Sequence, residues 1–201
     1  MRHKRLVIYT DGGSHGNPGP SGIGVVICGD GGEAVKNISK YIGETTNNVA
    51  EYMALIYGLQ EALILRADEV IINSDSELLV RQLKKEYKVK DKDLKVLNGQ
   101  VEHLLSGFRK YEINHIDRSL NKGADRLADL ATAVPNLSFS SNFGISQIFI
   151  RGIGNNFYTP GGDPGVAFYN DGAYVSDQEA TDVALFDVER VEVLRGPQGA
   201  L

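Results

Sequence analysis

The stretch Leu6-Val7-Ile8-Tyr9-Thr10-Asp11 is an apolar run of strand length that ends on an acidic residue. Its β-branched and aromatic side chains favour a β-strand over residues 5–10. A second run, Glu69-Val70-Ile71-Ile72-Asn73-Ser74-Asp75, has the same form. Because α/β sheets bind ligands at the carboxyl ends of their strands, Asp11 and Asp75 are predicted to lie together at one edge of a sheet.

Two further carboxylates follow helix-start signals. Glu51 ends Thr46-Asn47-Asn48-Val49-Ala50-Glu51, and Asp125 ends Asn121-Lys122-Gly123-Ala124-Asp125. Helix starts and strand ends meet along the same sheet edge, so four carboxylates are expected there. They would repel one another unless a hard divalent cation, which prefers oxygen ligands, lay between them. The alternative is four unrelated surface acids.

Hydrophobic periodicity predicts an α/β protein with the element order βββαβααβα. Gly29-Asp30-Gly31-Gly32 is a hairpin signal between the second and third strands, because Gly and Asp tolerate positive φ. Asn47 and Asn121 are the predicted N-caps of the first and last helices. This order gives a mixed sheet with an antiparallel meander and parallel partners. Strands are expected over residues 5–10, 22–28, 34–42, 69–73 and 111–116, and helices over 48–66, 76–85, 93–108 and 121–133.

Charge and composition divide the chain into two parts. Residues 1–134 hold 18 basic and 18 acidic side chains, whereas residues 135–201 hold 3 and 8 and carry the whole net charge of −5. The second part also holds 9 of the 23 glycines. We therefore expect a catalytic domain over 1–134 and a separate glycine-rich appendage over 135–201.

The single cysteine and the N-terminus limit the class of protein. Cys28 alone allows no intramolecular disulfide and no thiolate-rich metal site, and it is predicted to be a small core residue. The basic start, Met1 to Arg5, is followed by only five apolar residues, too few for a signal peptide or a membrane span. A cytoplasmic monomer without membrane contact is expected.

Four motifs, in this order, resemble type 1 ribonuclease H over residues 1 to about 134. They are Thr10–Pro20 (TDGGSHGNPGP), Thr46–Tyr52 (TNNVAEY), Ser74–Ser76 (SDS) and Arg118–Ala128 (RSLNKGADRLA). The resemblance implies a ribonuclease H-like fold, with a five-stranded sheet and helices on both faces. It also implies hydrolysis of the RNA strand of RNA–DNA hybrids, leaving 5′-phosphate and 3′-hydroxyl ends. A catalytically silent hybrid-binding module is the alternative from a binding class.

The chemistry of phosphodiester hydrolysis fits these acids. Two divalent metals can activate water, neutralise the phosphate and stabilise the leaving oxygen. Asp11 is the expected bridging ligand, flanked by Glu51, Asp75 and Asp125. Mg²⁺ keeps several waters and suits an open sheet edge, and Mn²⁺ is a possible substitute. Arg118 is expected to face the scissile phosphate, where a guanidinium stabilises charge but cannot act as a base.

Contacts to the hybrid are expected from two regions. Glycines in the loop Gly12–Pro20 would let backbone groups approach the RNA strand, although the same residues also suit a simple tight turn. Basic residues after the third carboxylate's helix would hold phosphates of the DNA strand, or form only a solvated helix face. The candidate substrate-binding residues are Gly12, Gly13, Ser14, Asn17, Asn47, Asn48, Lys84, Lys85 and Lys88.

Two departures from the family's pattern affect the expected site. Many relatives place a histidine in the loop before the last carboxylate, but residues 116–121 contain none. His115 is predicted to lie within the fifth strand. Glu77 stands where relatives often carry a glutamine that contacts bases, so this base contact is not expected here.

The appendage has a different resemblance. Ser146–Gly152, Tyr169–Val175 and Phe186–Gly199 resemble the plug domain of an outer-membrane TonB-dependent receptor. The alternation over Val188–Leu194 predicts a strand. A plug fragment is therefore a further functional alternative, but a chain ending at Val134 is expected to keep full activity. In the competing arrangement, four apolar residues of the appendage dock on the first domain and complete its core: Phe139, Phe143, Ile148 and Ile150.

Overall fold

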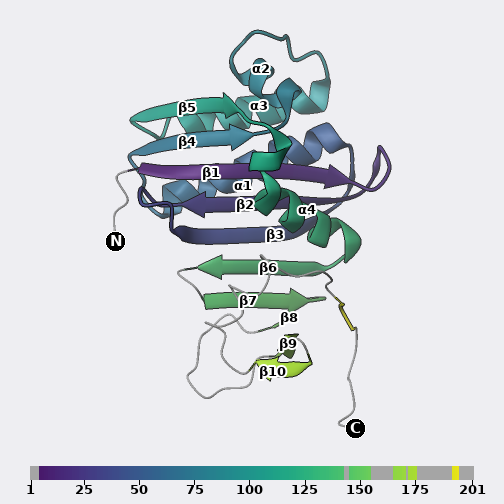
Figure 1. Ribbon diagram of the computed structural model, residues 1–201. Helices are drawn as coiled ribbons and strands as arrows, with labels where there is room; N and C mark the ends of the chain where they lie inside the picture. Colours follow the sequence, from purple (N-terminus) through teal and green to yellow (C-terminus); the bar gives the residue numbers. More distant parts are fainter. Residues whose placement is uncertain (1–4, 143–144, 155–164, 171, 176–191, 195–201) are drawn as a thin grey trace.

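The computed structural model describes residues 5–142, 145–154, 165–170, 172–175 and 192–194. Its main feature is a mixed sheet in the strand order β5-β4-β1-β2-β3-β6-β7-β8 (Figure 1). β4 pairs in parallel with β1 and β5, and the other neighbours pair antiparallel. The strands are β1 (Arg5–Ser14), β2 (Gly19–Cys28), β3 (Ala34–Thr45), β4 (Glu69–Ser74), β5 (Lys110–His115), β6 (Leu137–Asn142), β7 (Ile145–Ile150) and β8 (Ile153–Gly154).

The predicted order βββαβααβα is confirmed from β1 to the end of α4. The helices are α1 (Asn47–Ile64), α2 (Glu77–Leu83), α3 (Lys92–Leu105) and α4 (Lys122–Ala133), with a 3-10 turn, η1, over Arg118–Leu120. The expected number of five strands is wrong, because the sheet has eight. The three additional strands come from residues after α4, which continue the sheet beyond β3.

Helices cover both faces of the sheet, with α1 on one side and α4 on the other (Figure 1). Glycines let both helices approach closely. A Cβ atom on Gly24 of β2 would lie 1.9 Å from the carbonyl oxygen of Ala124 in α4, and one on Gly58 of α1 would lie 2.8 Å from Ile8. Side chains at these two positions would push the helices away from the sheet.

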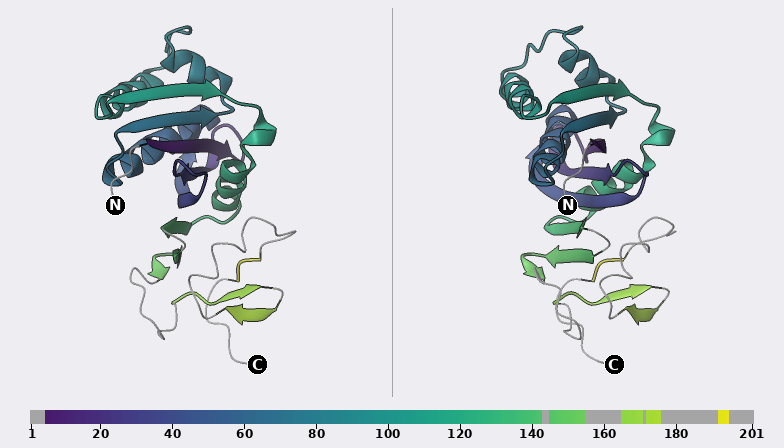
Figure 2. Two further views of the ribbon diagram at one scale, coloured as in Figure 1. Left: turned by 60° about the vertical axis from the view of Figure 1, so that its left-hand side comes forward. Right: turned by 90° about the vertical axis from the view of Figure 1, so that its left-hand side faces the viewer.

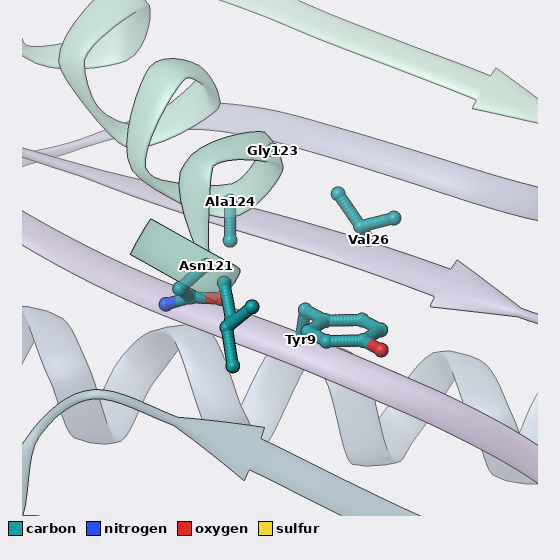
Figure 3. A pocket seen from close by; sticks show the side chains of 6 residues that line it. Tyr9, Val26, Asn121, Gly123 and Ala124 are labelled. Atoms are coloured by element: carbon teal, nitrogen blue, oxygen red, sulfur yellow. The ribbon is translucent and has the colours of Figure 1, made fainter. Parts of the chain in front are cut away.

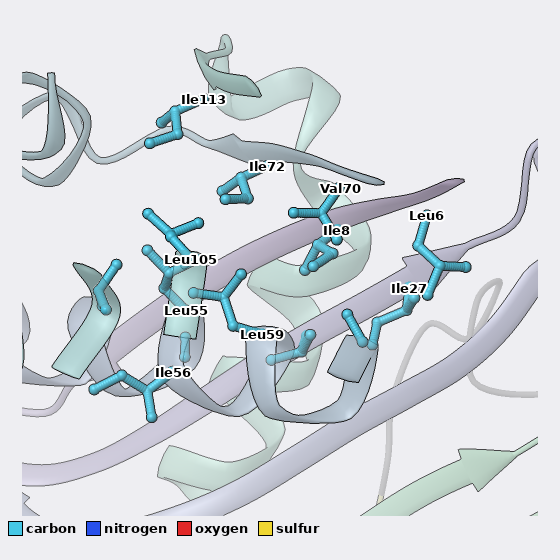
Figure 4. Close-up of a cluster of buried hydrophobic side chains, with 14 of the residues drawn as sticks. Leu6, Ile8, Ile27, Leu55, Ile56, Leu59, Val70, Ile72, Leu105 and Ile113 are labelled. Atoms are coloured by element: carbon cyan, nitrogen blue, oxygen red, sulfur yellow. The ribbon is translucent and has the colours of Figure 1, made fainter. Parts of the chain in front are cut away.

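The main core lies between the sheet and the helices α1 to α3 (Figure 4). Leu6 and Ile8 of β1, Ile72 of β4, and Leu55 and Leu59 of α1 are fully buried there. Strand side chains alternate between faces, so the apolar residues at even positions of β1 point toward α1. This packing fixes where the carboxyl ends of β1 and β4 lie relative to the start of α1.

A second, smaller core involves the strands after α4. Val26 of β2, Leu127 of α4 and Phe139 of β6 are buried together, and Ile148 of β7 packs against them. β6 pairs with β3 from Lys36↔Asn142 to Lys40↔Ser138. Phe139 and Ile148 therefore do dock on the preceding elements, as in the competing arrangement.

The described residues after β8 contain little regular secondary structure. β9 (Phe168–Asn170) and β10 (Ala173–Val175) form a separate two-stranded sheet, at the same end of the molecule as β6 to β8 (Figure 2). Phe143 lies outside the described residues. So does most of the strand predicted over 188–194, of which only 192–194 are described, without regular structure.

Candidate active site

Adjacent parallel strands bring Asp11 and Asp75 together. β1 and β4 pair in register up to Thr10↔Ser74, so Asp11 and Asp75 lie side by side where this pairing ends, although β1 itself continues to Ser14 beside β2. Asp11 is 9% exposed, and Asp75 is half-buried. The predicted meeting of these two carboxylates at one sheet edge is confirmed.

Glu51 reaches the same edge from α1. Gly12 is buried against the start of this helix, where a Cβ atom would lie 2.2 Å from the backbone nitrogen of Glu51. The backbone N–H of Gly12 donates to the Glu51 carboxylate. Glu51 is 6% exposed, yet its Oε2 has no hydrogen-bond partner among the described residues. A buried carboxylate oxygen without a donor is costly unless something positive binds it.

Asp125 comes from the first turn of α4 and pairs with Arg118. The guanidinium donates to Asp125 Oδ1 from Nε at 3.1 Å and from Nη2 at 2.5 Å. The Arg118 side chain is 73% exposed, whereas that of Asp125 is 21% exposed. Arg118 is thus anchored at the carboxylate cluster, with most of its surface open to solvent.

The four carboxylates share one electrostatic environment. Burial, followed by the charges of Asp75 and Asp125, raises the pKa of Asp11 from 3.8 to about 7. Burial, followed by the charges of Asp11 and Asp75, raises the pKa of Glu51 well above its ordinary value. The side chains are therefore close enough to oppose one another's ionisation.

The donor set fits divalent cations. Four carboxylates on strand ends and helix starts offer the oxygen ligands that Mg²⁺ prefers, and the unpaired Glu51 Oε2 lies among them. Within the described part of the chain, however, no three acidic, histidine or cysteine side chains stand close enough to form a ready-made metal site. Asp125 is paired with Arg118 in this arrangement.

The expected Gly12–Pro20 loop is shorter than predicted. β1 continues through Gly12, Gly13 and Ser14, and β2 begins at Gly19. Gly12 is buried against α1, so close packing accounts for this glycine, and its predicted contact with the hybrid stays a prediction. Gly13 and Ser14 are half-buried, and the Ser14 hydroxyl donates to the carbonyl oxygen of Thr45 at 3.1 Å.

Three exposed asparagines lie near the start of α1. The predicted N-cap at Asn47 is wrong, because Thr46 caps α1 by accepting a hydrogen bond from Val49 N–H. Asn47 instead uses its own backbone N–H to donate to Asn17 Oδ1 at 3.2 Å. Asn17, Asn47 and Asn48 are all exposed, so their side chains are available to a ligand.

The basic residues occupy the connection between α2 and α3. Lys84, Lys85 and Lys88 are exposed, and Lys85 Nζ lies 3.6 Å from Glu102 Oε1. His115 ends β5 as predicted, exposed at the sheet edge, with its Nε2 3.2 Å from the Asp75 carbonyl oxygen. Glu77 begins α2 and pairs with Arg81 on the same helix.

Sequence reasoning missed two residues of this site. Asn121, predicted as a helix cap, makes no side-chain cap and instead donates to Asp75 Oδ1 at 2.6 Å. Asp129 lies one helical turn after Asp125, and its charge contributes to the raised pKa of Asp11. The i, i+4 spacing of Asp125 and Asp129 was a visible signal for the second residue.

Comparisons with known proteins agree with this fold. The "Reverse transcriptase-like" family model matches residues 9–131. The bifunctional protein Rv2228c of Mycobacterium tuberculosis is 44% identical over 126 residues, covering 62% of this chain and 35% of that protein. Ribonuclease HI of Halobacterium salinarum is 40% identical over 131 residues, covering 65% of each chain. This chain thus spans about a third and about two thirds of the lengths of these two relatives.

A solved structure and a second family model also match this chain. LC11-RNase H1 in complex with an RNA/DNA hybrid is 44% identical, with a TM-score of 0.61, over 64% of this chain and 96% of that chain. A model of the TonB-dependent receptor plug domain matches residues 114–201, overlapping the end of the first match. No helix in the described ranges has the length and apolar character needed to cross a membrane. Because the first model matches more than half of the sequence, the chain belongs to the reverse transcriptase-like family, among the type 1 ribonucleases H.

Proposed function

We propose that this protein hydrolyses the RNA strand of RNA–DNA hybrids in a reaction that depends on divalent metal. The observation that carries the proposal is the meeting of Asp11, Glu51, Asp75 and Asp125 at one sheet edge, where burial and then the charges of Asp75 and Asp125 raise the pKa of Asp11 to about 7. The hybrid bound to the similar LC11-RNase H1 supports the substrate. The expected products carry 5′-phosphate and 3′-hydroxyl ends.

Each carboxylate has a distinct part in the proposed mechanism. Asp11, which interacts with the charges of Asp75 and Asp125, is the proposed central ligand, and Glu51 would contribute its unpaired Oε2. Bound Mg²⁺ or Mn²⁺ would activate a water molecule and neutralise charge on the phosphate. Arg118, exposed beside Asp125, would stabilise negative charge that grows on the phosphate oxygens.

The hybrid would cross the rim formed by the start of α1 and the connection between α2 and α3. Asn17, Asn47 and Asn48 present hydrogen-bonding groups there, which suits recognition of the RNA strand by its 2′-hydroxyls. Lys84 and Lys88 would contact phosphates of the DNA strand.

Cleavage of a strand-labelled RNA–DNA hybrid, with Mg²⁺, with Mn²⁺ and with EDTA, tests the proposal. We expect metal-dependent cuts in the RNA strand alone, and no cuts in single-stranded RNA or duplex DNA. Hybrid binding without cleavage at any metal concentration would instead identify a silent binding module.

Arg118→Ala is expected to lower the cleavage rate at saturating hybrid by at least about tenfold, with little change in KM. The guanidinium meets charge that develops in the transition state, so its loss should affect kcat. Steady-state kinetics measure both constants. Arg118→Lys, which keeps the charge but loses the planar fork, should recover only part of the rate. Weak hybrid binding with normal turnover at saturation would make Arg118 a phosphate clamp only.

Lys84→Ala and Lys88→Ala are each expected to weaken hybrid binding at low salt and to reduce the slope of log affinity against log salt by about 1. Both side chains are exposed in the connection after α2, the helix that follows Asp75. Binding is measured by fluorescence anisotropy in Ca²⁺ or EDTA over a salt series. Lys110→Ala is the matched control, because this exposed lysine begins β5 at the opposite end of the sheet. An equal effect of all three changes would contradict the assignment.

A further inference from the structure

A buried amide joins the strands and the helix that carry three of the carboxylates. Asn121 is 1% exposed and precedes α4, but its side chain makes no cap. Its Nδ2 donates to the carbonyl oxygen of Thr10 at 2.9 Å and to Asp75 Oδ1 at 2.6 Å. Figure 3 shows the side chain at the start of α4, beside β1. The amide therefore ties the start of α4 to β1 at Thr10 and to Asp75, the residue that follows β4.

The hydrogen bonds determine which way the amide points. Both partners of Nδ2 are acceptors, a carbonyl oxygen and a carboxylate oxygen, so only the NH₂ end can face them. The Oδ1 atom of Asn121 has no hydrogen-bond partner within the described ranges. Rotating the amide would leave three oxygens facing one another, so the observed orientation is the favourable one.

The main chain of Asn121 extends the same connection. Its carbonyl oxygen accepts the backbone N–H of Asp125 at 3.1 Å. Asn121 thus contacts Thr10, which directly precedes Asp11, as well as Asp75 and Asp125 themselves. The described contacts of one residue therefore reach the segments that carry three of the four carboxylates.

We propose that Asn121 is a positioning residue that holds the Asp75 carboxylate in the orientation needed to bind a divalent cation together with Asp11. The inference rests on the proposed metal-dependent function. A neutral N–H donor steadies the carboxylate without adding a positive charge that would compete with the cation. Arg118, by contrast, is an exposed cation on Asp125. Partners that orient metal ligands typically change metal affinity by about 10- to 100-fold when they are removed.

Two substitutions separate positioning from a merely structural role. Asn121→Ala removes the amide. Asn121→Ser supplies a hydroxyl that can cap α4, but one that is too short to bridge Thr10 and Asp75. Ser39→Ala is the matched control, because the fully buried Ser39 hydroxyl also ties a strand to α4, but through Leu127 O at 2.6 Å and not through a carboxylate.

Mn²⁺ binding is measured by calorimetry on each folded protein without nucleic acid, next to hybrid cleavage and the metal-free melting temperature. We expect both Asn121 variants to bind Mn²⁺ about tenfold or more weakly, with kcat reduced and the hybrid KM little changed. Ser39→Ala should lower only the melting temperature. If both Asn121 variants bind Mn²⁺ like the wild type, the positioning role is wrong while the proposed function stands. If the wild type neither binds Mn²⁺ nor cleaves the hybrid, both proposals fail.

Discussion

Replacing Asp11 by asparagine is expected to lower the rate of metal-dependent hybrid cleavage by at least about 10²-fold while the fold is retained. The substitution keeps the volume of the side chain but removes the charge at the centre of the carboxylate cluster. Losing a few kcal/mol of transition-state stabilisation corresponds to a rate loss of this size. Cleavage of labelled hybrid under single-turnover conditions measures the effect.

The same substitution is expected to stabilise the metal-free protein. In the folded state the pKa of Asp11 is raised to about 7 from 3.8, so the folded protein holds a proton that the unfolded chain releases. Stability from this group is therefore fully present below about pH 4 and is lost as the pH rises through about 7. In EDTA, Asp11→Asn should melt higher than the wild type at pH 8, and this difference should disappear near pH 4.

Adding Mg²⁺ or Mn²⁺ at pH 8 should reverse the order, because a cation bound by the folded state stabilises the wild type by mass action. Asp30→Asn is the control, since exposed Asp30 pairs with Arg5 at the other end of the sheet. It should change neither cleavage nor the metal-dependent shift. A folded Asp11→Asn protein that cleaves at the wild-type rate would remove Asp11 from the site.

The part of the site that could be predicted depends on local patterns. Asp11 and Asp75 each follow an apolar run of strand length, and the two runs pair in parallel and in register, so sequence alone places these residues together even though β1 continues to Ser14. Glu51 and Asp125 follow helix-start signals that the structure reproduces to within a few residues. Periodicity specified these elements because each buries one face, that of β1, β4 and α1 in the main core and that of α4 against Val26 and Phe139.

The missed details depend on contacts between distant segments. Thr46 and Asn47 are both good N-cap types, and only the observed hydrogen bond to Val49 distinguishes them. Glycine suits a turn as well as close packing, so the burial of Gly12 against α1 could not be predicted from the neighbouring sequence. The Asn121 side chain donates a hydrogen bond to the carbonyl oxygen of Thr10, which lies more than a hundred residues earlier in the sequence, and no sequence spacing reveals this pairing.

The three additional strands were not predicted because the composition of the residues after Val134 suggests a separate part of the chain, whereas strand pairing joins these residues to the sheet. Residues after Val134 differ in charge and glycine content from those before, which favoured a separate appendage. Yet Leu137 and Phe139, at alternating positions of β6, are both buried, Phe139 packs with Val26 and Leu127, and β6 pairs with β3. We therefore propose that the structural unit around the site extends to Gly154, at the end of β8.

A chain that ends at Val134 is accordingly expected to melt on the order of 10 °C lower than one that ends at Gly154. Truncation at Val134 removes Leu137 and Phe139, which are 4% and 3% exposed, and uncovers Val26 and Leu127. Burying each of the two lost side chains contributes roughly 1.5–3 kcal/mol, and 1 kcal/mol shifts the melting temperature by roughly 2–4 °C in a domain of this size. The truncation also exposes the unpaired edge of β3, which favours aggregation.

Melting temperature, solubility and hybrid cleavage are compared for the full chain and both truncated chains in one buffer. The chain ending at Gly154 should match or exceed the full chain in hybrid affinity at low salt, because it lacks acidic residues that repel nucleic acid. In the full chain, Phe139→Ala should reproduce much of the loss at Val134, whereas Ile153→Ala, at a side chain 66% exposed, should be neutral. If the chain ending at Val134 has the same melting temperature as the chain ending at Gly154 and cleaves equally well, β6 to β8 extend the sheet without stabilising it. The structural unit that carries the site then ends with α4.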